Sequence, residues 1–237
     1  MPIEKRAAIS PLFRASHSAL HTSRGFTLVE LLVVISIIGI LVGMSFPLLG
    51  IVKKKQYIAH ATGEMHQLEA AIESYKSSLG FYPPSNPGNP LTNQLYYELT
   101  GMAATSTAGQ FKTLDGMETL DKATLDAAFG ANKVGGFVNC TRYNADAETA
   151  SAKNFIGSTK PAQTKTFTSV TLFVSSVNGP DSGYKPMGQQ DFNPWRYVSP
   201  GVKNPNSYDL WIQLRIGGKT NLICNWTTKA QTDVPMP

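Results

Sequence analysis

A single acidic side chain, Glu30, interrupts a long apolar run near the start of the chain. It is the only charged residue between positions 26 and 52. A carboxylate at the centre of a membrane helix costs roughly 2.5–3.5 kcal/mol, and less near the helix end, so it calls for a compensating cation. Cleavage after Gly25 would create an α-amine on Phe26, near the depth of Glu30 in a neighbouring copy. Such a cleavage would let the acid of one copy pair with the amine of another, and so turn a membrane anchor into an assembly element.

The element that must position this acid is a helix over residues 26–52. Its uncharged part, residues 31–52, would be about 33 Å long, which is enough to cross the hydrocarbon core of a bilayer. Lysines follow at positions 53–55, where lysines usually mark the lipid headgroup boundary. A plain single-pass anchor, with Glu30 reaching the membrane interface, is the alternative interpretation. It leaves the Gly25-Phe26 pair without a role.

The same helix is expected to continue with one apolar face. Past the lysines, apolar side chains recur at alternating intervals of three and four residues, the period of a single helix face. These side chains are Ile58, Ala61, Met65, Leu68, Ile72, Tyr75 and Leu79. Gly80 and two prolines shortly after it predict the end of the helix. We therefore expect a helix from Phe26 to about Leu79, whose amphipathic half, residues 53–80, packs on a domain.

The C-terminal half of the chain carries strand patterns. Residues 166–175 read as a strand, residues 195–198 form a short candidate, and residues 208–214 alternate like a half-buried strand. The glycines at 217–218 predict a turn, after which residues 220–224 can return antiparallel. The expected fold class is therefore α+β, with a long N-terminal helix packed on a small antiparallel β-sheet. The last three strands are expected to form a meander.

The patterns between the helix and these strands are weaker. Thr92 is expected to cap a short helix. Residues 101–113 are small and polar, which predicts a surface loop. Asp115 and Glu118 have capping-box spacing ahead of an apolar run that ends at Phe129, so a second short helix is expected there.

The N-terminal residues closely resemble the class III signal of type IV pilins and of the pseudopilins of type II secretion. In that family a prepilin peptidase cuts after the glycine, here Gly25, and methylates the new N-terminal phenylalanine, here Phe26. Glu30 matches the family's single acid, which serves in assembly. Pro47 falls where the family has its helix-loosening proline.

The resemblance also implies how the chain is organised and where it works. It implies a cleaved leader (residues 1–25), a transmembrane and assembly half-helix (residues 26–52) and a periplasmic pilin-like domain (residues 53–237). The expected location is the bacterial inner membrane, crossed once, and then a filament after assembly. Expected partners are other copies of the chain, related pseudopilins, the prepilin peptidase, the inner-membrane secretion platform and membrane lipid.

A second group of residues, in the last fifth of the chain, resembles the C-terminal half of the major pseudopilins of type II secretion. That family typically reads Asp-Pro-Trp-Gly, a Pro-Gly turn, Tyr-Asp-Leu, a Gly-rich loop and finally Asn-Trp. The matching residues here are Asp191, Pro194, Trp195, Pro200, Gly201, Tyr208, Asp209, Asn225 and Trp226. Because ordinary pilins share only the N-terminal helix, this group favours a pseudopilin.

The family's Gly-rich loop normally contains aspartates that bind calcium, a cation that takes six to eight oxygen ligands. The corresponding residues 215–221 are fewer and include no carboxylate. Arg215 and Lys219 would instead oppose a divalent cation. We therefore predict that the family calcium site is lost, and we expect no other metal or cofactor.

The chain has two cysteines, Cys140 and Cys224. In an oxidising compartment they could pair, and some pilin-like proteins have such a bond. The alternative is two separate buried thiols that behave as small apolar residues. Sequence alone gives no distance between them.

The net charge and the lack of known catalytic motifs limit the other functions that the chain could have. The formal net charge is +5, of which residues 1–25 hold +3, so the processed chain would carry only +2. Phosphate binding requires a clustered basic face, so no nucleic-acid partner is expected. The chain contains no nucleophile elbow, phosphate-binding loop, His-Glu-x-x-His or dinucleotide fingerprint, so we expect no enzyme.

The sequence thus predicts a structural subunit of a type II secretion pseudopilus, processed by prepilin peptidase and polymerised from the inner membrane. Two alternatives stay open. The first is a type IV pilin or a DNA-uptake pilin, which has the same structural class. The second is a membrane-tethered binding module, which a deep pocket with convergent polar groups in residues 81–190 would favour.

Overall fold

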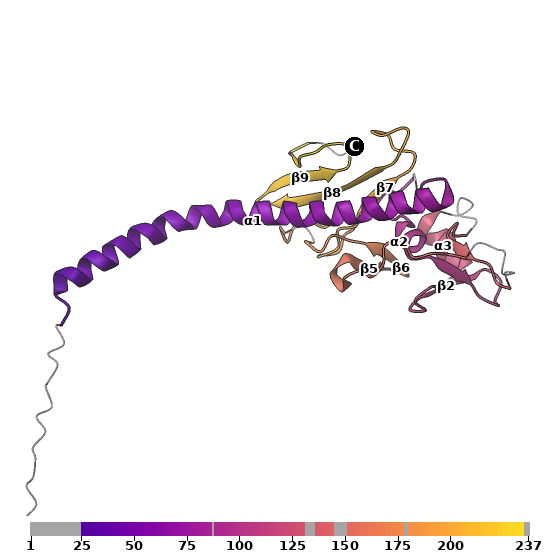
Figure 1. The fold of residues 1–237 in the computed structure, drawn as a ribbon, viewed down its shortest axis with the longest axis horizontal. Helices are drawn as coiled ribbons and strands as arrows, with labels where there is room; N and C mark the ends of the chain where they lie inside the picture. Colours follow the sequence, from indigo (N-terminus) through magenta and orange to yellow (C-terminus); the bar gives the residue numbers. More distant parts are fainter. Residues whose placement is uncertain (1–24, 87, 131–135, 145–150, 178–179, 235–237) are drawn as a thin grey trace, which may run out of the picture. The chain divides into compact units, whose positions relative to one another are not determined.

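The computed structural model describes residues 25–234 except for 87, 131–135, 145–150 and 178–179. The chain divides into two compact units, Met1–Leu48 and Leu49–Pro237. One helix, α1 (Leu28–Leu79), contributes residues to both units (Figure 1). Of the leader predicted for residues 1–25, only Gly25 lies within the described residues.

The long helix predicted from residue 26 to about 79 is confirmed by α1. Gly80 ends it in a left-handed conformation (φ +87°), and the Gly80 N–H donates to the Lys76 carbonyl oxygen at 2.8 Å. Pro47 lies within the helix, but the side chains of residues 45–49 are outside the described ones, so its loosening role stays a prediction. Among the described residues, none of the helices combines the length and the apolarity needed to cross a membrane.

The predicted apolar stripe of α1 is buried in the second unit. Ala61, Met65, Leu68, Ile72 and Tyr75 are each at most 5% exposed. They belong to one hydrophobic cluster together with side chains from the strands. The helix is thus held by its amphipathic half, as its period indicates.

The main sheet has the strand order β10-β9-β8-β7 and is antiparallel throughout. Its strands are β7 (Arg196–Val198), β8 (Asp209–Ile216), β9 (Lys219–Cys224) and β10 (Gln231–Thr232). The predicted three-stranded meander is therefore confirmed, and β10 adds a fourth strand that the sequence pattern did not reveal.

The prediction that β8 is half-buried is wrong. Its first six residues are all buried, so both faces of the strand are covered. Leu210, Ile212 and Leu214 enter the main core beneath α1. On the opposite face, Trp211 packs with Leu222 and Cys224 and is covered in part by Val198 and Trp226.

A second sheet forms where a surface loop was predicted. It has the order β3-β2-β1-β4 and comprises β1 (Met102–Ala104), β2 (Gln110–Thr113), β3 (Thr119–Asp121) and β4 (Cys140–Thr141). Its antiparallel pairs are supplemented by a parallel pair of β1 with β4. The strands are only two to four residues long, too short to show a period in the sequence.

The two predicted helix caps in this region are also wrong. Helix α2 (Leu95–Thr100) follows Gln94, which makes no side-chain cap, so Thr92 does not begin it. Helix α3 (Lys122–Phe129) is capped by Asp121, whose carboxylate accepts from the Thr124 N–H at 2.7 Å. Asp115 and Glu118 lie instead in the β2–β3 connection.

The strand predicted over residues 166–175 is in fact a tight hairpin. After the short helix η1 (Pro161–Gln163), β5 (Thr164–Phe167) pairs antiparallel with β6 (Val170–Phe173). The turn places Thr168 at a positive φ of 56°. Every residue of β6 is buried, so the alternation in its sequence does not correspond to one buried and one exposed face.

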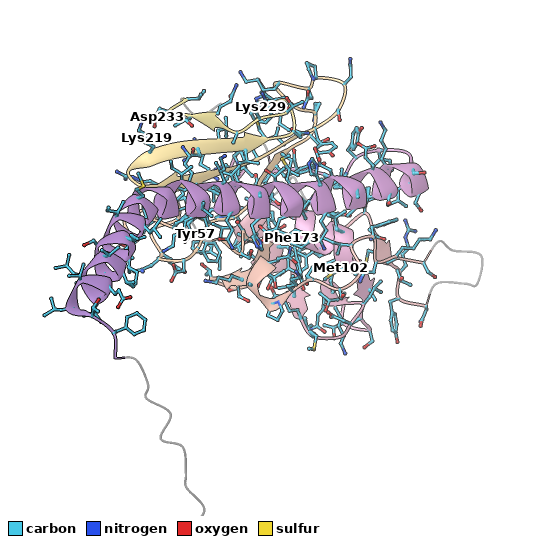
Figure 2. All side chains as sticks on the ribbon, turned by 60° about the vertical axis from the view of Figure 1, so that its left-hand side comes forward. Tyr57, Met102, Phe173, Lys219, Lys229 and Asp233 are labelled. Atoms are coloured by element: carbon cyan, nitrogen blue, oxygen red, sulfur yellow. The ribbon has the colours of Figure 1, made fainter. Side chains whose placement is uncertain are left out.

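The helices and sheets of the second unit are arranged in layers. In Figures 1 and 2 the later part of α1 lies between the main sheet on one side and β5, β6, α2 and α3 on the other. Met102 and Phe173, labelled in Figure 2, lie on the latter side, whereas Lys219 and Asp233 lie on the sheet side. The predicted α+β class, a long helix packed on an antiparallel sheet, is confirmed.

Candidate functional site

The acid singled out in the sequence, Glu30, is held by its own helix start. The Thr27 N–H and the Thr27 hydroxyl each donate to Glu30 Oε2 at 2.8 Å. In return the Glu30 N–H donates to Thr27 Oγ1 at 3.2 Å. This is a capping box, in which a residue before the helix and an acid three positions later satisfy each other's backbone donors. The carboxylate therefore has a local role that the charge argument missed, although the spacing Thr27-x-x-Glu30 is itself the known signature.

Around this acid the helix exposes apolar side chains on every side. Phe26 is 80% exposed, and the described apolar residues from Leu28 to Met44 are likewise exposed. One hydroxyl in this stretch, on Ser36, donates to the Leu32 carbonyl oxygen at 2.7 Å and so needs no outside partner. An apolar surface of this extent is covered by lipid or by protein in a working molecule.

The C-terminal group of family-like residues centres on Asp209. Its buried carboxylate accepts from the N–H groups of Val202 and Lys203 at 2.7 Å each, and from Asn204 at 2.9 Å. The Pro-Gly turn, which includes Gly201, is thereby wrapped around a charged acceptor. Hydrogen bonds of this kind are about twice as strong as neutral ones. Asp209 thus fixes the connection between β7 and β8.

Asn225 and Trp226 close the same end of the main sheet. Asn225 Oδ1 accepts from the Leu210 N–H at 3.1 Å, and its Nδ2 donates to the Tyr208 carbonyl oxygen at 2.9 Å. The ring of Trp226 packs edge-on against Trp211, with centroids 5.8 Å apart. Tyr208, Asp209, Asn225 and Gly201 are therefore brought together, as a structural brace of the sheet.

The first three residues of that group lie in a separate place. The Trp195 N–H donates to the Phe173 carbonyl oxygen at 2.9 Å, and Pro194 forms a bridge with Val174. Asp191 adopts a left-handed conformation (φ 56°), and its carbonyl oxygen accepts from Lys165 Nζ at 2.5 Å. This part of the group ties β6 to the segment that leads into β7 of the main sheet.

One buried acid was missed by the sequence argument. Glu98, on α2, is fully buried and accepts from the Val138 and Asn139 N–H groups at 2.9 Å each and from the Tyr75 hydroxyl at 3.0 Å. Burial raises the pKa of its carboxyl, and these hydrogen bonds lower it in part. Its signal in the sequence was a lone acid within an apolar, aromatic segment. Glu98 joins α1 to α2 and to the segment before β4.

The two cysteines do not pair. Cys140 lies on β4 of the second sheet, whereas Cys224 lies on β9 of the main sheet, and both are free thiols. The Cys224 sulfur lies 3.1 Å from the hydroxyl oxygen of Thr227. The suggested disulfide is therefore not formed. The alternative of two separate buried thiols fits Cys224, which is buried, whereas Cys140 is half-buried.

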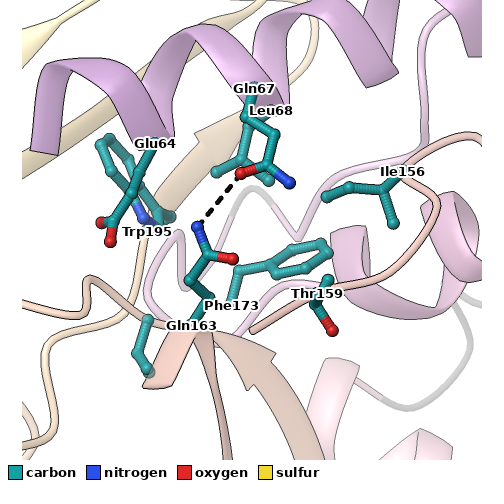
Figure 3. Close-up of a pocket in the computed structure, with 9 residues that line it drawn as sticks. Glu64, Gln67, Leu68, Ile156, Thr159, Gln163, Phe173 and Trp195 are labelled. Carbon is teal, nitrogen blue, oxygen red and sulfur yellow. Dashed lines mark hydrogen bonds between the residues drawn. The ribbon is translucent and has the colours of Figure 1, made fainter. Parts of the chain in front are cut away.

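A small cavity lies beneath α1, and Figure 3 shows its walls. It holds only about 10 Å³, room for roughly one water molecule. Across it, Gln163 Nε2 donates to Gln67 Oε1 at 3.1 Å, and Glu64 accepts from the Ser176 N–H at 3.1 Å and from its hydroxyl. The cavity is too small for a metabolite-sized ligand. Within the described residues no three His, Cys, Asp or Glu side chains are grouped to hold a metal.

A larger hollow of about 510 Å³ lies between α3 and the β5–β6 turn. Its walls include Ala123, Ala127, Ser169 and Val170. None of the residues that line it is charged, but five of them are polar: Asn89, Thr92, Thr124, Thr168 and Ser169. The alternative of a membrane-tethered binding module therefore stays open.

The N-terminal segment is the part of the chain that is similar to known proteins. Residues 20–46 match the family model for the prokaryotic N-terminal methylation motif. The chain is also 42% identical over 65 residues to the type II secretion system core protein G of Escherichia coli (strain K12). That match covers 27% of this chain and 45% of the relative, so the chain spans less than half of the relative's length. No solved structure is significantly similar to the chain. The resemblance stated from the sequence is thus confirmed at the N-terminal segment.

Proposed function

We propose that the chain is a pseudopilin of type II secretion, cut by prepilin peptidase and polymerised from the inner membrane to support protein export. One observation carries the proposal. Glu30 is the only charge between residues 26 and 52, and it follows Gly25-Phe26 inside a segment that matches the N-terminal methylation motif. The described apolar side chains around it, from Leu28 to Met44, are exposed, which suits a subunit that first lies in lipid and then against other helices.

The proposed mechanism is assembly by charge pairing. Hydrolysis of the Gly25–Phe26 bond consumes one water and leaves a carboxylate on Gly25 and an ammonium group on Phe26. N-methylation of that amine leaves its positive charge in place. The amine of one subunit then approaches Glu30 of its neighbour, and this contact sets the axial register, while helix packing replaces the lost lipid contacts.

The proposal assigns the chain's partners and its location. Residues 26–52 lie in the inner membrane before assembly, and the domain of residues 53–237 lies in the periplasm. Partners are other copies, related pseudopilins, the prepilin peptidase, the secretion platform and lipid. No catalysis is proposed, because the buried acids Asp209 and Glu98 accept from the domain's own backbone donors. No nucleic-acid binding is proposed, because the processed chain would carry a net charge of only +2.

Processing gives the first test. The full chain is co-expressed with a prepilin peptidase, and the mature N-terminus is read by mass spectrometry, with an inactive peptidase as the control. The expected product begins at Phe26 and carries one methyl group. A chain that still begins at Met1 in the presence of active peptidase would refute the proposal.

Substitutions at Glu30 separate its two roles. Glutamine can replace glutamate in a capping box, but it carries no charge. Glu30→Gln should therefore keep the helix start, be cleaved normally, and still fail to enter filaments, as Glu30→Ala should. Incorporation is measured by crosslinking of neighbouring subunits in membranes. If Glu30→Gln assembles like the unchanged chain while Glu30→Ala does not, capping and not charge pairing is the function of this acid.

The alternative of a type IV pilin or a DNA-uptake pilin shares the N-terminal segment. What favours the secretion role is the brace around Asp209 and Asn225, because it is built from the residues that resemble the major pseudopilins. Expression in a bacterium that lacks its own core protein G provides the comparison. Restored export of the secreted proteins supports the proposal, whereas long surface fibres or DNA uptake without export support the alternative.

A further inference from the structure

The tip of the β8–β9 hairpin is a two-residue turn with two left-handed glycines. Ile216 pairs with Lys219, and the residues between them, Gly217 and Gly218, have φ values of 60° and 77°. This is the conformation of a type I′ turn, which suits the twist of the two strands. The Gly217 and Gly218 N–H groups are not used in the β8–β9 ladder, so they can bind water or another acceptor.

The acceptor comes from a distant part of the chain. Asp181 Oδ1 accepts from the Gly217 N–H at 3.0 Å, and Asp181 Oδ2 accepts from the Gly218 N–H at 2.8 Å. The Asp181 N–H also donates to the Arg215 carbonyl oxygen at 3.0 Å. One residue thus makes three hydrogen bonds to the end of the hairpin, across 36 positions of sequence.

This turn stands where the resemblance implies a calcium loop, and its residues do not fit that ion. Calcium requires six to eight oxygen ligands, but the two glycines point N–H donors at this place. Arg215 and Lys219 flank the turn and add positive charge. Both oxygens of the nearby carboxylate are already engaged by those donors. An anion is therefore the complementary group here, and Asp181 supplies it.

The same loop continues over the outer face of the sheet. The Tyr184 N–H donates to the Asp181 carbonyl oxygen at 2.9 Å. The Tyr184 hydroxyl then lies between two polar side chains of the sheet: it donates to Gln213 Oε1 at 3.3 Å and accepts from Arg196 Nη2 at 3.3 Å. Arg196 is 2% exposed, so this loop covers a buried cation. Asp181 holds the start of this loop against the hairpin.

We propose that Asp181 takes the place of a metal ion in this domain, by clamping the Gly217-Gly218 turn and anchoring the loop that follows, so that the fold is independent of calcium. The inference depends on contacts within the domain and does not require the secretion role. It assigns to Asp181 a positioning function that composition alone could not indicate, because the residue lies outside the hairpin it orders.

Thermal unfolding of the full chain in detergent micelles tests the proposal. The unchanged protein should have the same Tm in excess calcium and in excess EDTA. Asp181→Ala should lower the Tm by roughly 3–6 °C in both buffers, since two charge-assisted hydrogen bonds are lost. Asp126→Ala is the matched control, because this acid makes only an exposed ion pair with Lys122 and should shift the Tm little.

Hydrogen exchange provides a readout that does not depend on a truncated side chain. Asp181→Asn keeps only one of the two acceptor oxygens and loses the negative charge. The Gly217 and Gly218 amides should therefore exchange faster than in the unchanged protein, while the amides of β8 should not. A Tm that rises with calcium, or tight calcium binding in calorimetry, would overturn the proposal. So would unchanged exchange at both glycines in Asp181→Asn.

Discussion

Gly201 lies directly against the carboxylate of Asp209. A Cβ atom built on this glycine would be 2.5 Å from Asp209 Oδ1 and 2.9 Å from the Asn204 carbonyl oxygen. The glycine does not have the positive φ that usually demands this residue type. It is required by space alone, because the turn must approach the acid closely enough for its N–H groups to bind it.

The first prediction concerns this contact. Gly201→Ala should destabilise the domain by about 1–3 kcal/mol, because either the turn or the Asp209 side chain must move. The control is Gly183→Ala, an exposed position with no atom within 4 Å of the added Cβ. Denaturant unfolding followed by tryptophan fluorescence measures the difference, since all three tryptophans are in the domain. Equal stabilities of the two variants would contradict the packing argument.

The second prediction uses adjacent tyrosines on α2. The Tyr97 hydroxyl accepts from the buried Thr171 N–H at 2.6 Å and donates to Glu118 Oε2 at 2.9 Å. Tyr97→Phe leaves both groups without that partner and should cost about 1–3 kcal/mol. Among the described residues, the Tyr96 hydroxyl makes no such pair of bonds, so Tyr96→Phe should be near neutral. The two variants are compared by urea unfolding, and a larger loss for Tyr96→Phe would refute this assignment.

The third prediction is a pH dependence set by Glu98. Because burial raises the pKa of this carboxyl in the folded state, the folded protein binds the proton more tightly than the unfolded chain does. Its contribution to stability is therefore fully present below the unfolded pKa of about 4.3. That contribution is lost as the pH rises through the raised folded pKa.

Glu98→Gln is the matched variant for this measurement. It lacks the titrating group and loses one backbone hydrogen bond, a cost that does not vary with pH. The free energy of unfolding of the unchanged protein minus that of Glu98→Gln should therefore fall as the pH rises from about 4 to 7. A difference that stays flat or rises over this range would show that Glu98 does not titrate as stated.

The fourth prediction concerns the thiols. Because Cys140 and Cys224 are free and lie on different sheets, alkylation of the denatured protein without reductant should add two groups. Cys224, being buried, should react more slowly than Cys140 in the native protein. Intact-mass spectrometry of the purified protein measures both the number of added groups and the rate of the reaction. A mass two hydrogens lower with no alkylation would reveal the bond that the structure does not contain.

The elements predicted correctly are those whose period is long enough to read. The apolar stripe of α1 repeats over many turns, and the Gly217-Gly218 turn is flanked by two alternating strands, so both were visible in the sequence. The strands β1 to β4 have too few residues to show a period. Their segment also contains small polar residues that are typical of loops, which is why a sheet was missed there.

Burial depends on partners from elsewhere in the chain, and the sequence of a strand does not contain them. Alternation in β8 indicated one exposed face, but Trp226 and Tyr184 come from other segments to cover it. The Asp181 clamp was invisible for the same reason. The capping box at Thr27 was readable, and it was overlooked because the charge of Glu30 suggested a more distant partner.

That capping box has a consequence for growth of the proposed fibre. Both Thr27 donors bind the same carboxylate oxygen, Glu30 Oε2, so Oε1 can accept from an arriving amine while the capping box stays intact. Elongation under the proposed pairing thus adds a contact to an acid whose orientation is fixed in advance by its own helix start. The acid then determines where each copy stops along its neighbour. The exposed apolar side chains on either side of it supply the surface on which neighbouring copies pack in the proposed fibre.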